Sequence, residues 1–270
     1  MKEASRTSKN RTATGAGEAF EALLDIIRRL RAPDGCPWDR VQTLQSLKTY
    51  CIEEAYEVVQ AIEDGDREEL REELGDLLMQ VVFQADLAAD EGAFDIAGVC
   101  NGAVKKLIDR HPHVFGDKKA KDAAEVLDRW EKYKRREGRG VLSGVPRHLP
   151  ALMMALRMSE KVSHVGFDWP DETGAIEKLD EEILELKEAL AGKDDKAVEE
   201  ELGDVLFTVA NVARMRGVNP EEALRRMMER FKRRFEYVEA ELAKKGEGVK
   251  GTPLPTLETL WEDAKRFAQE

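Results

Sequence analysis

The sequence predicts an all-α fold built from two similar helical bundles. Apolar residues recur at spacings of three and four along most of the chain, as on one face of a helix, and no run shows the strict alternation of a half-buried strand. Charged residues form 36% of the 270 residues and aromatic residues only 6%. Several predicted helices are joined by very short connectors, which favours antiparallel neighbours.

An internal duplication organises the chain. The blocks EEAYE (53–57) and ELGD (73–76) return as EEILE (181–185) and ELGD (201–204), in both cases 128 residues later. Two copies are too few for a solenoid, so we interpret them as two homologous domains. We expect a disordered tail, an N-terminal domain, a linker and a C-terminal domain, at residues 1–17, 18–136, 137–149 and 150–270 respectively.

Turn residues set the limits of the expected helices. Asp64-Gly65-Asp66 ends one helix and begins the next, and Gly192-Lys193 does the same in the second half. Gly- and Pro-containing segments at 135–150 and 246–256 separate the two halves and the last two helices. The expected helices are 18–31, 43–63, 67–91, 94–110, 123–136, 150–162, 173–191, 195–216, 220–244 and 256–268.

Composition excludes several classes of protein. The 55 acidic residues exceed the 43 basic residues, and the net charge of −12 argues against non-specific binding to nucleic acid, which needs a basic surface. The sequence contains no run of 18 apolar residues, so it predicts no membrane-spanning helix. The polar first 17 residues do not resemble a secretory signal. Cys36, Cys51 and Cys100 include no C-x-x-C pair. We therefore expect a cytoplasmic protein without nucleic-acid or membrane partners.

Four of the expected helices carry an acidic pair on the same border of their apolar stripe. With about 100° per residue, Ala55 and Ile62 mark the predicted core stripe of 43–63, and Leu74 marks that of 67–91. Antiparallel packing would bring the acidic borders together in a partly buried groove. The acidic pairs are Glu54 and Glu57, Glu73 and Asp76, Glu182 and Glu185, and Glu201 and Asp204.

Converging carboxylates repel one another unless a cation lies between them. Hard oxygen ligands without a neighbouring His or Cys select Mg²⁺, with Mn²⁺ as a substitute. Carboxylate-held Mg²⁺ usually keeps coordination positions for water and for substrate phosphates. A single E-E-x-x-E is usually a solvated helix face. The pattern here recurs on two adjacent helices, at one flank, and in both halves, which favours metal sites between antiparallel helices.

These motifs resemble those of the MazG nucleoside triphosphate pyrophosphohydrolase family. E-E-x-x-E followed by E-x-x-D within L-G-D-x-L occurs in both halves, and GCPWD (35–39), RHPHVFGD (110–117) and VGFDW (165–169) extend the match. The resemblance implies tandem MazG-type bundles, a homodimer, and Mg²⁺-dependent cleavage of NTPs and dNTPs to the monophosphate and pyrophosphate. It assigns the metal ligands to the eight carboxylates given above.

Residues beside the second acidic block are candidates for catalysis. Lys178 lies on the same flank as Glu182 and Glu185, where it could contact the nucleotide, and the alternative is an i, i+4 ion pair with Glu182. Glu181 and Glu200 adjoin predicted ligands and could orient the attacking water or accept its proton. Their alternative is a solvated or ion-paired position.

Further substrate-binding candidates lie near the C-terminus. The resemblance places Arg230 and Arg234, one turn apart, on phosphate. It also favours stacking of Trp261 on a base and contact of Lys265 with phosphate. For the arginines the alternative is a solvated helix face, and for Trp261 it is an anchor that holds the last helix to the core.

The two halves are not equivalent. Tyr50 occupies the position that corresponds to Lys178, so the first half lacks this cation. In two-domain members of the family the C-terminal half carries the activity, and the resemblance implies the same here, with the N-terminal site weaker or regulatory. No P-loop motif is present. A narrower dCTP, dUTP or phosphoribosyl-ATP pyrophosphohydrolase and a nucleotide-sensing regulatory protein remain alternatives.

Overall fold

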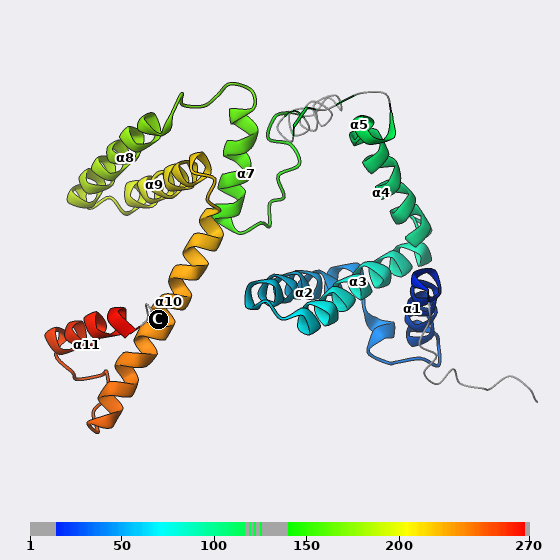
Figure 1. The fold of residues 1–270 in the computed structure, drawn as a ribbon, viewed down its shortest axis with the longest axis horizontal. Helices are drawn as coiled ribbons and strands as arrows, with labels where there is room; N and C mark the ends of the chain where they lie inside the picture. Colours follow the sequence, from blue (N-terminus) through cyan, green and yellow to red (C-terminus); the bar gives the residue numbers. More distant parts are fainter. Residues whose placement is uncertain (1–14, 117–118, 120, 123–124, 126–139, 268–270) are drawn as a thin grey trace, which may run out of the picture. The chain divides into compact units, whose positions relative to one another are not determined.

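The computed structural model describes residues 15–116, 119, 121–122, 125 and 140–267, and every regular element in this part of the chain is a helix (Figure 1). The all-α prediction is therefore confirmed. The chain divides into two compact units, Met1–Lys121 and Asp122–Glu270. The expected tail at 1–17, except for its last three residues, and the expected helix 123–136, except for residue 125, lie outside the described residues. The expected domain boundaries stay a prediction.

The first unit contains two helices that pack closely as an antiparallel hairpin, α2 and α3, with α1 and α4 against α3. The elements are α1 (Ala16–Arg31), the 3₁₀ helix η1 (Asp39–Val41), α2 (Leu44–Asp64), α3 (Arg67–Asp90), α4 (Ile96–Arg110) and the single turn α5 (Pro112–Phe115).

The second unit repeats the hairpin as α8 and α9, with α7 against α9 and the long α10 against α11. The elements are α7 (Ala151–Ser163), α8 (Glu172–Gly192), α9 (Asp195–Met215), α10 (Pro220–Lys244) and α11 (Leu254–Phe267). Within the described residues each predicted helix lies within two residues of an observed one. The short η1 and α5 were not predicted.

The two hairpins turn in the same way. Gly65 ends α2 and Lys193 ends α8, both in the left-handed conformation, with φ of 72° and 57°. Asp66 and Asp194 then cap the next helix, and each carboxylate accepts hydrogen bonds from the backbone N–H groups two and three residues on. These local interactions fix the antiparallel packing that brings the acidic borders together.

One buried apolar cluster joins α1 to the hairpin helices α2 and α3, and another lies outside the second hairpin. Ile27, Leu47, Val82 and Phe83 form one buried cluster, and Val238, Leu242 and Leu260 form another between α10 and α11. None of the described helices is long and apolar enough to cross a membrane.

The predicted core stripes of the hairpins are largely uncovered. Ile62 on α2, Leu74 on α3 and Leu202 on α9 are each 45% exposed or more. This corrects the prediction that these stripes are buried within the chain. The physical reason is that a two-helix hairpin buries only the strip between its helices, and no described residue covers the apolar face at these three positions.

Candidate metal centres on the two helical hairpins

The α8–α9 hairpin brings three predicted metal ligands together. Glu182, Glu201 and Asp204 each place a carboxylate oxygen within 4.8 Å of the other two. The i, i+3 spacing on α9 puts Glu201 and Asp204 on one face, and the short turn after α8 aligns Glu182 opposite them. Glu182 is buried, although carboxylates rarely are unless they are paired.

The electrostatics of this cluster favour a cation. Oε2 of Glu201 is buried and has no hydrogen-bond partner. The fourth predicted ligand, Glu185, has a raised pKa because it shares a hydrogen bond with Glu182 when protonated, because it is desolvated, and because the Glu201 carboxylate repels its charge. A divalent cation would satisfy the unpartnered oxygen and relieve the repulsion, so the residues present fit such an ion.

Lys178 lies at the edge of the same cluster. Its Nζ is 2.7 Å from Oε1 of Glu181 and 3.0 Å from Oε1 of Glu182, and these two carboxylates raise the pKa of the lysine. The structure therefore has the ion pair that was the alternative interpretation of Lys178. The ammonium group of Lys178 is at the same time in direct contact with Glu182, which is one of the predicted metal ligands.

The α2–α3 hairpin forms the corresponding cluster in the first unit. Oxygens of Glu54, Glu57 and Glu73 lie within 4.8 Å of one another. The pKa of Glu54 is raised by desolvation and then by the charges of Asp76 and Glu57. The pKa of Glu73 is raised by desolvation and then by the same kind of repulsion from Glu57 and Asp76. Asp76 therefore takes part electrostatically, although it is outside the group of three.

The two predicted catalytic carboxylates lie outside these groups of three. Glu181 is exposed and pairs with Lys178, and Glu200 is exposed and pairs with Lys196 at 3.3 Å. These are the ion-paired positions that were weighed as the alternative. Their catalytic role stays a prediction.

The predicted phosphate and base contacts lie on other helices. Trp261 on α11 packs against the Val238–Leu242–Leu260 cluster, with its ring centroid 5.0 Å from that of Phe231. Lys265 pairs with Glu262 at 2.6 Å. In the described part of the chain, Trp261 thus has the anchoring contacts that were its alternative interpretation.

Arg230 and Arg234 lie on α10, which contacts α7, α9 and α11. Within the described residues α10 does not pack on α8, so a single chain does not bring the two arginines beside all the ligands of the α8–α9 cluster. Arg230 is exposed, whereas Nε of Arg234 is buried without a hydrogen-bond partner. The sequence prediction had placed these groups in one nucleotide site. Residue spacing could not exclude that arrangement, because it does not show which helices pack together.

The structure also adds a residue that sequence reasoning missed. Gln80 on α3 is 5% exposed, and its amide partly offsets the rise in the pKa of Glu54 that desolvation and the charges of Asp76 and Glu57 cause. Its position four residues after Asp76 and seven after Glu73 places it on the same face of the helix, and that spacing was a signal that could have identified it.

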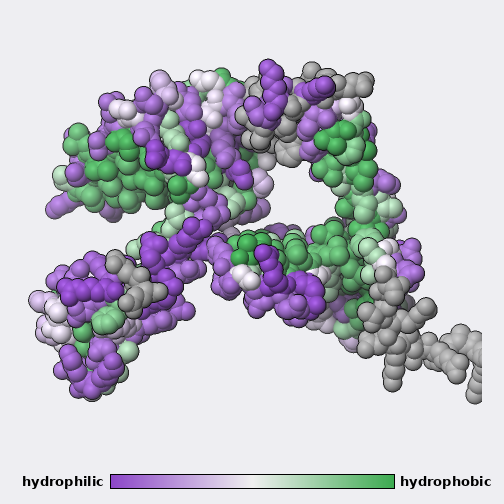
Figure 2. All heavy atoms as spheres, viewed as in Figure 1, coloured by the Kyte–Doolittle hydropathy of each residue, from purple (hydrophilic) through white to green (hydrophobic). Residues whose placement is uncertain are grey.

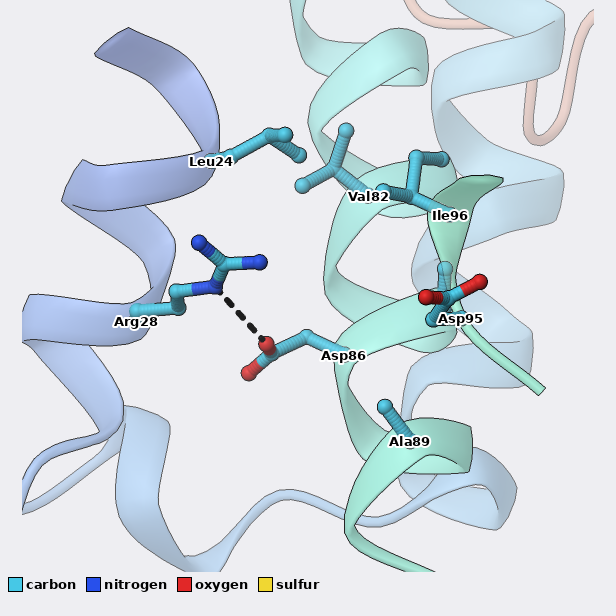
Figure 3. A pocket seen from close by; sticks show the side chains of 8 residues that line it. Leu24, Arg28, Val82, Asp86, Ala89, Asp95 and Ile96 are labelled. Atoms are coloured by element: carbon cyan, nitrogen blue, oxygen red, sulfur yellow. Dashed lines mark ion pairs between the residues drawn. The ribbon is translucent and has the colours of Figure 1, made fainter. Parts of the chain in front are cut away.

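A small cavity in the first unit is unsuited to a nucleotide. It lies between α1, α3 and the start of α4, has a volume of about 30 Å³, and is lined by residues that include Leu24, Val82 and Ile96 (Figure 3). Nε of Arg28 lies 3.8 Å from Oδ1 of Asp86 at its edge. A space of this size holds about one water molecule. The ion pair of Arg28 with Asp86 joins α1 to α3, which explains it as a structural contact.

Comparison with known proteins bears on both hairpins. The MazG nucleotide pyrophosphohydrolase domain matches residues 42–115 and 171–239. The nucleoside triphosphate pyrophosphohydrolase/pyrophosphatase MazG of Thermotoga maritima is 45% identical over 252 residues, which cover 93% of this chain and 97% of the relative. The nucleoside triphosphate pyrophosphohydrolase of Escherichia coli K12 is 43% identical over 257 residues, 92% of this chain and 97% of the relative. The uncharacterised YabN of Bacillus subtilis is 42% identical, but this match spans only 51% of YabN.

Proposed function

This chain belongs to the MazG nucleotide pyrophosphohydrolase family, and we propose that its α8–α9 cluster is the Mg²⁺-dependent centre of the reaction. The chain is a nucleoside triphosphate pyrophosphohydrolase, which adds water to a nucleoside triphosphate and releases the monophosphate and pyrophosphate. The observation that carries the placement is the buried, unpartnered Oε2 of Glu201 beside Glu182 and Asp204.

The donor set supports Mg²⁺, with Mn²⁺ as a substitute. Glu182, Glu201 and Asp204 would hold the ion and Glu185 would complete the set, and all four offer hard oxygen ligands. When bound, the ion supplies charge neutralisation at the triphosphate oxygens and polarises water.

The chain's own residues hold and orient the substrate. Lys178 is the cation nearest to the proposed ligands, and its ammonium group is placed to exchange Glu182 for a phosphate oxygen when the nucleotide enters. The side chains of Glu181 and Glu200 are proposed to accept a proton from the attacking water at a carboxylate oxygen. Arg230, Arg234 and Lys265 are proposed to contact phosphate, and Trp261 the base.

We also propose that the active protein is a homodimer. Apolar side chains gather over α8 and α9 on the face seen in Figure 2, and each of them is at least 40% exposed in the single chain. Surfaces of this kind mark interfaces, and two hairpins packed face to face make a four-helix bundle. The residues are Ile176, Leu184 and Leu190 on α8 and Leu202, Leu206, Phe207 and Val209 on α9.

A homodimer also offers a way to unite the separated parts of the site. The arginines of α10 and the α8–α9 cluster do not meet fully within one chain, so a second copy can contribute one set to the other.

Cys36, Cys51 and Cys100 are all free thiols, which is consistent with the proposed cytoplasmic location.

The reaction is tested by incubating the purified chain with each NTP, each dNTP, dUTP and phosphoribosyl-ATP, and by measuring pyrophosphate and monophosphate. We expect pyrophosphate release that requires Mg²⁺ and stops when EDTA is added. Turnover restricted to dCTP, dUTP or phosphoribosyl-ATP would narrow the substrate class. Mg²⁺-dependent nucleotide binding without any turnover would instead indicate a regulatory protein.

The dimer is tested by light scattering after size-exclusion chromatography. We expect a mass of two chains, and a mass of one chain for Leu206→Asp, which introduces a charge into the apolar face. Lys187→Asp, an exposed position on α8, is the matched control. Mixing Glu201→Gln with Arg234→Ala should restore activity if one copy supplies the ligands and the other supplies the arginine.

A further inference from the structure

A lysine side chain lies against the proposed metal ligands of the second hairpin. Nζ of Lys178 is 3.0 Å from Oε1 of Glu182 and 2.7 Å from Oε1 of Glu181. The side chain of Glu182 is only 7% exposed, and one of its oxygens lies within 4.8 Å of oxygens of Glu201 and Asp204. One buried carboxylate is therefore both the partner of an ammonium group and a proposed metal ligand.

The ammonium group does not satisfy the whole cluster. Oε2 of Glu201 is buried and has no hydrogen-bond partner, although Lys178 pairs with the neighbouring Glu182. The cluster therefore still favours a divalent cation. A cation that binds Glu182 shares this ligand with Nζ, and like charges repel more strongly in a partly buried site than in water. Lys178 thus lowers the affinity of the cluster for a cation that arrives by itself.

The first hairpin indicates that the fold does not need a lysine at this position. Tyr50 is the equivalent of Lys178, 128 residues earlier. The α2–α3 hairpin nevertheless has the same left-handed turn and the same aspartate N-cap as the α8–α9 hairpin. The ammonium group therefore needs an explanation other than the construction of the hairpin, and the chemistry of the cluster offers one.

A nucleoside triphosphate can release the shared carboxylate. The side chain of Lys178 is 35% exposed, and its flexible stem lets Nζ rotate away from Glu182. Phosphate oxygens accept charge-assisted hydrogen bonds from an ammonium group as carboxylates do. Once a phosphate accepts the hydrogen bonds of Nζ, Glu182 is free to bind the cation. The phosphate charge then also offsets the repulsion between the two positive groups.

We propose that Lys178 couples the binding of a divalent cation to the binding of the nucleotide at the α8–α9 cluster. Paired with Glu182, the lysine weakens binding of the cation alone, and its transfer to a phosphate removes that penalty. Each ligand then raises the affinity for the other by the same factor. The inference rests on the proposed function, because it takes this cluster as the cation site and a triphosphate as the substrate. It adds that the site fills with cation and nucleotide together.

The test measures the Mn²⁺ affinity of the full chain by electron paramagnetic resonance, in a Glu73→Gln background that removes a predicted ligand of the first hairpin. Lys178→Met keeps the length of the side chain but not its charge, and without nucleotide it should bind Mn²⁺ about 10-fold more tightly. Lys178→Arg keeps a positive charge and should keep the weak affinity. Glu201→Gln should abolish this binding, which would show that the measurement reports the second hairpin.

The second part of the test adds an ATP analogue with a methylene group between the α- and β-phosphorus atoms, where the bond cannot be hydrolysed. After correction for Mn²⁺ that the analogue binds in solution, it should raise the Mn²⁺ affinity of the parent chain. In Lys178→Met this gain should be about 10-fold smaller, because the penalty that the nucleotide removes is already absent. Lys187→Met removes a charge at an exposed position of α8, and as the matched control it should leave both affinities unchanged.

The outcomes separate the coupling from the proposed function. Equal or weaker Mn²⁺ binding by Lys178→Met, or an equal gain from the analogue in this variant and its parent, would overturn the coupling and leave the metal site in place. If Lys178→Met gives no cooperative thermal melt, Lys178→Gln is measured with the same expected results. If no variant shows Mn²⁺ binding that Glu201→Gln removes, the coupling and the proposed placement of the metal are both wrong. Pyrophosphate release by the unmodified chain tests the reaction itself, which does not enter these measurements.

Discussion

The two helical hairpins have the same backbone plan but different groups around their carboxylates. Positions 128 residues apart are buried in both, with Leu47 matched by Ala175 and Val82 by Ala210. The turns and N-caps also match. The polar partners differ, since Lys178 pairs with Glu182 in α8, whereas the equivalent position in α2 is occupied by Tyr50, which has no ammonium group. A duplicated scaffold can therefore place carboxylates alike and still tune each site by one neighbouring side chain.

The ion pairs that fasten each hairpin to the rest of its unit have opposite polarity. Asp86 on α3 pairs with Arg31 of α1. The equivalent of Asp86 is Arg214 on α9, and it pairs through both Nη atoms with Asp168, in the segment before α8. The hairpin helix supplies the acidic partner in the first unit and the basic partner in the second. Both arrangements place a partly buried ion pair at the equivalent position.

The largest expected difference between the hairpins is catalytic. Glu201→Ala should lower kcat for pyrophosphate release by at least about 100-fold, because it removes a proposed metal ligand, whereas Glu73→Ala should cost less than about 10-fold. Glu188→Ala, an exposed position on α8, is the control. If only Glu73→Ala abolishes turnover, catalysis belongs to the first hairpin.

The next effect concerns the cation that only the second hairpin has. Lys178→Ala should lower kcat/KM by about 100-fold, as when one donor to developing charge is removed. Tyr50→Phe, at the equivalent position of α2, is the matched variant and should have little effect. Unchanged steady-state kinetics for Lys178→Ala would mean that the lysine serves only its ion pairs with Glu181 and Glu182.

Stability should depend on the ion pair of the second unit. Arg214→Ala should lower the free energy of unfolding by about 3 kcal/mol, since it leaves Asp168 without its partner in a site where the two side chains are 13% and 26% exposed. Arg216→Ala breaks a pair with Glu172 whose side chains are 66% and 52% exposed, and should cost at most about 1 kcal/mol. Urea denaturation measures both, and similar losses would contradict the burial argument.

Metal removal should expose the repulsion within both clusters. The raised pKa values of Glu54, Glu73 and Glu185 mean that the folded chain binds these protons more tightly than the unfolded chain. The metal-free protein therefore gains stability as pH falls through these pKa values and loses it as pH rises through them.

Mg²⁺ relieves the same repulsion when the carboxylates are ionised. At a hundredfold excess over its Kd, it should raise Tm by about 5 °C at pH 8 and by less at pH 5. Differential scanning calorimetry with and without EDTA measures the shift. A shift that does not depend on pH would argue against binding by these carboxylates.

The smallest effect concerns the matched turns. Lys193 is a non-glycine residue at positive φ, so Lys193→Gly should raise the free energy of unfolding by about 0.5–1 kcal/mol. Gly65→Ala, at the equivalent position, should lower it by about 1 kcal/mol. Thermal melts of the two variants should shift in opposite directions, and shifts of the same sign would show that the turns are not equivalent.

The sequence by itself determined the helices, the duplication and the carboxylates. Helix limits were predictable because caps such as Asp66 and Asp194 act within a few residues, and the acidic borders were predictable because i, i+3 spacing fixes a helix face. The acidic borders of neighbouring helices were expected to converge, because the turns between these helices are too short for any packing other than antiparallel.

Only the tertiary structure decided which groups meet across helices. It placed Trp261 on the core of α10 and α11, and it kept Arg230 on a helix that does not pack on α8. It also left Leu74 and Leu206 uncovered. These outcomes depend on packing between segments far apart in the chain, which the local periodicity of a sequence does not encode.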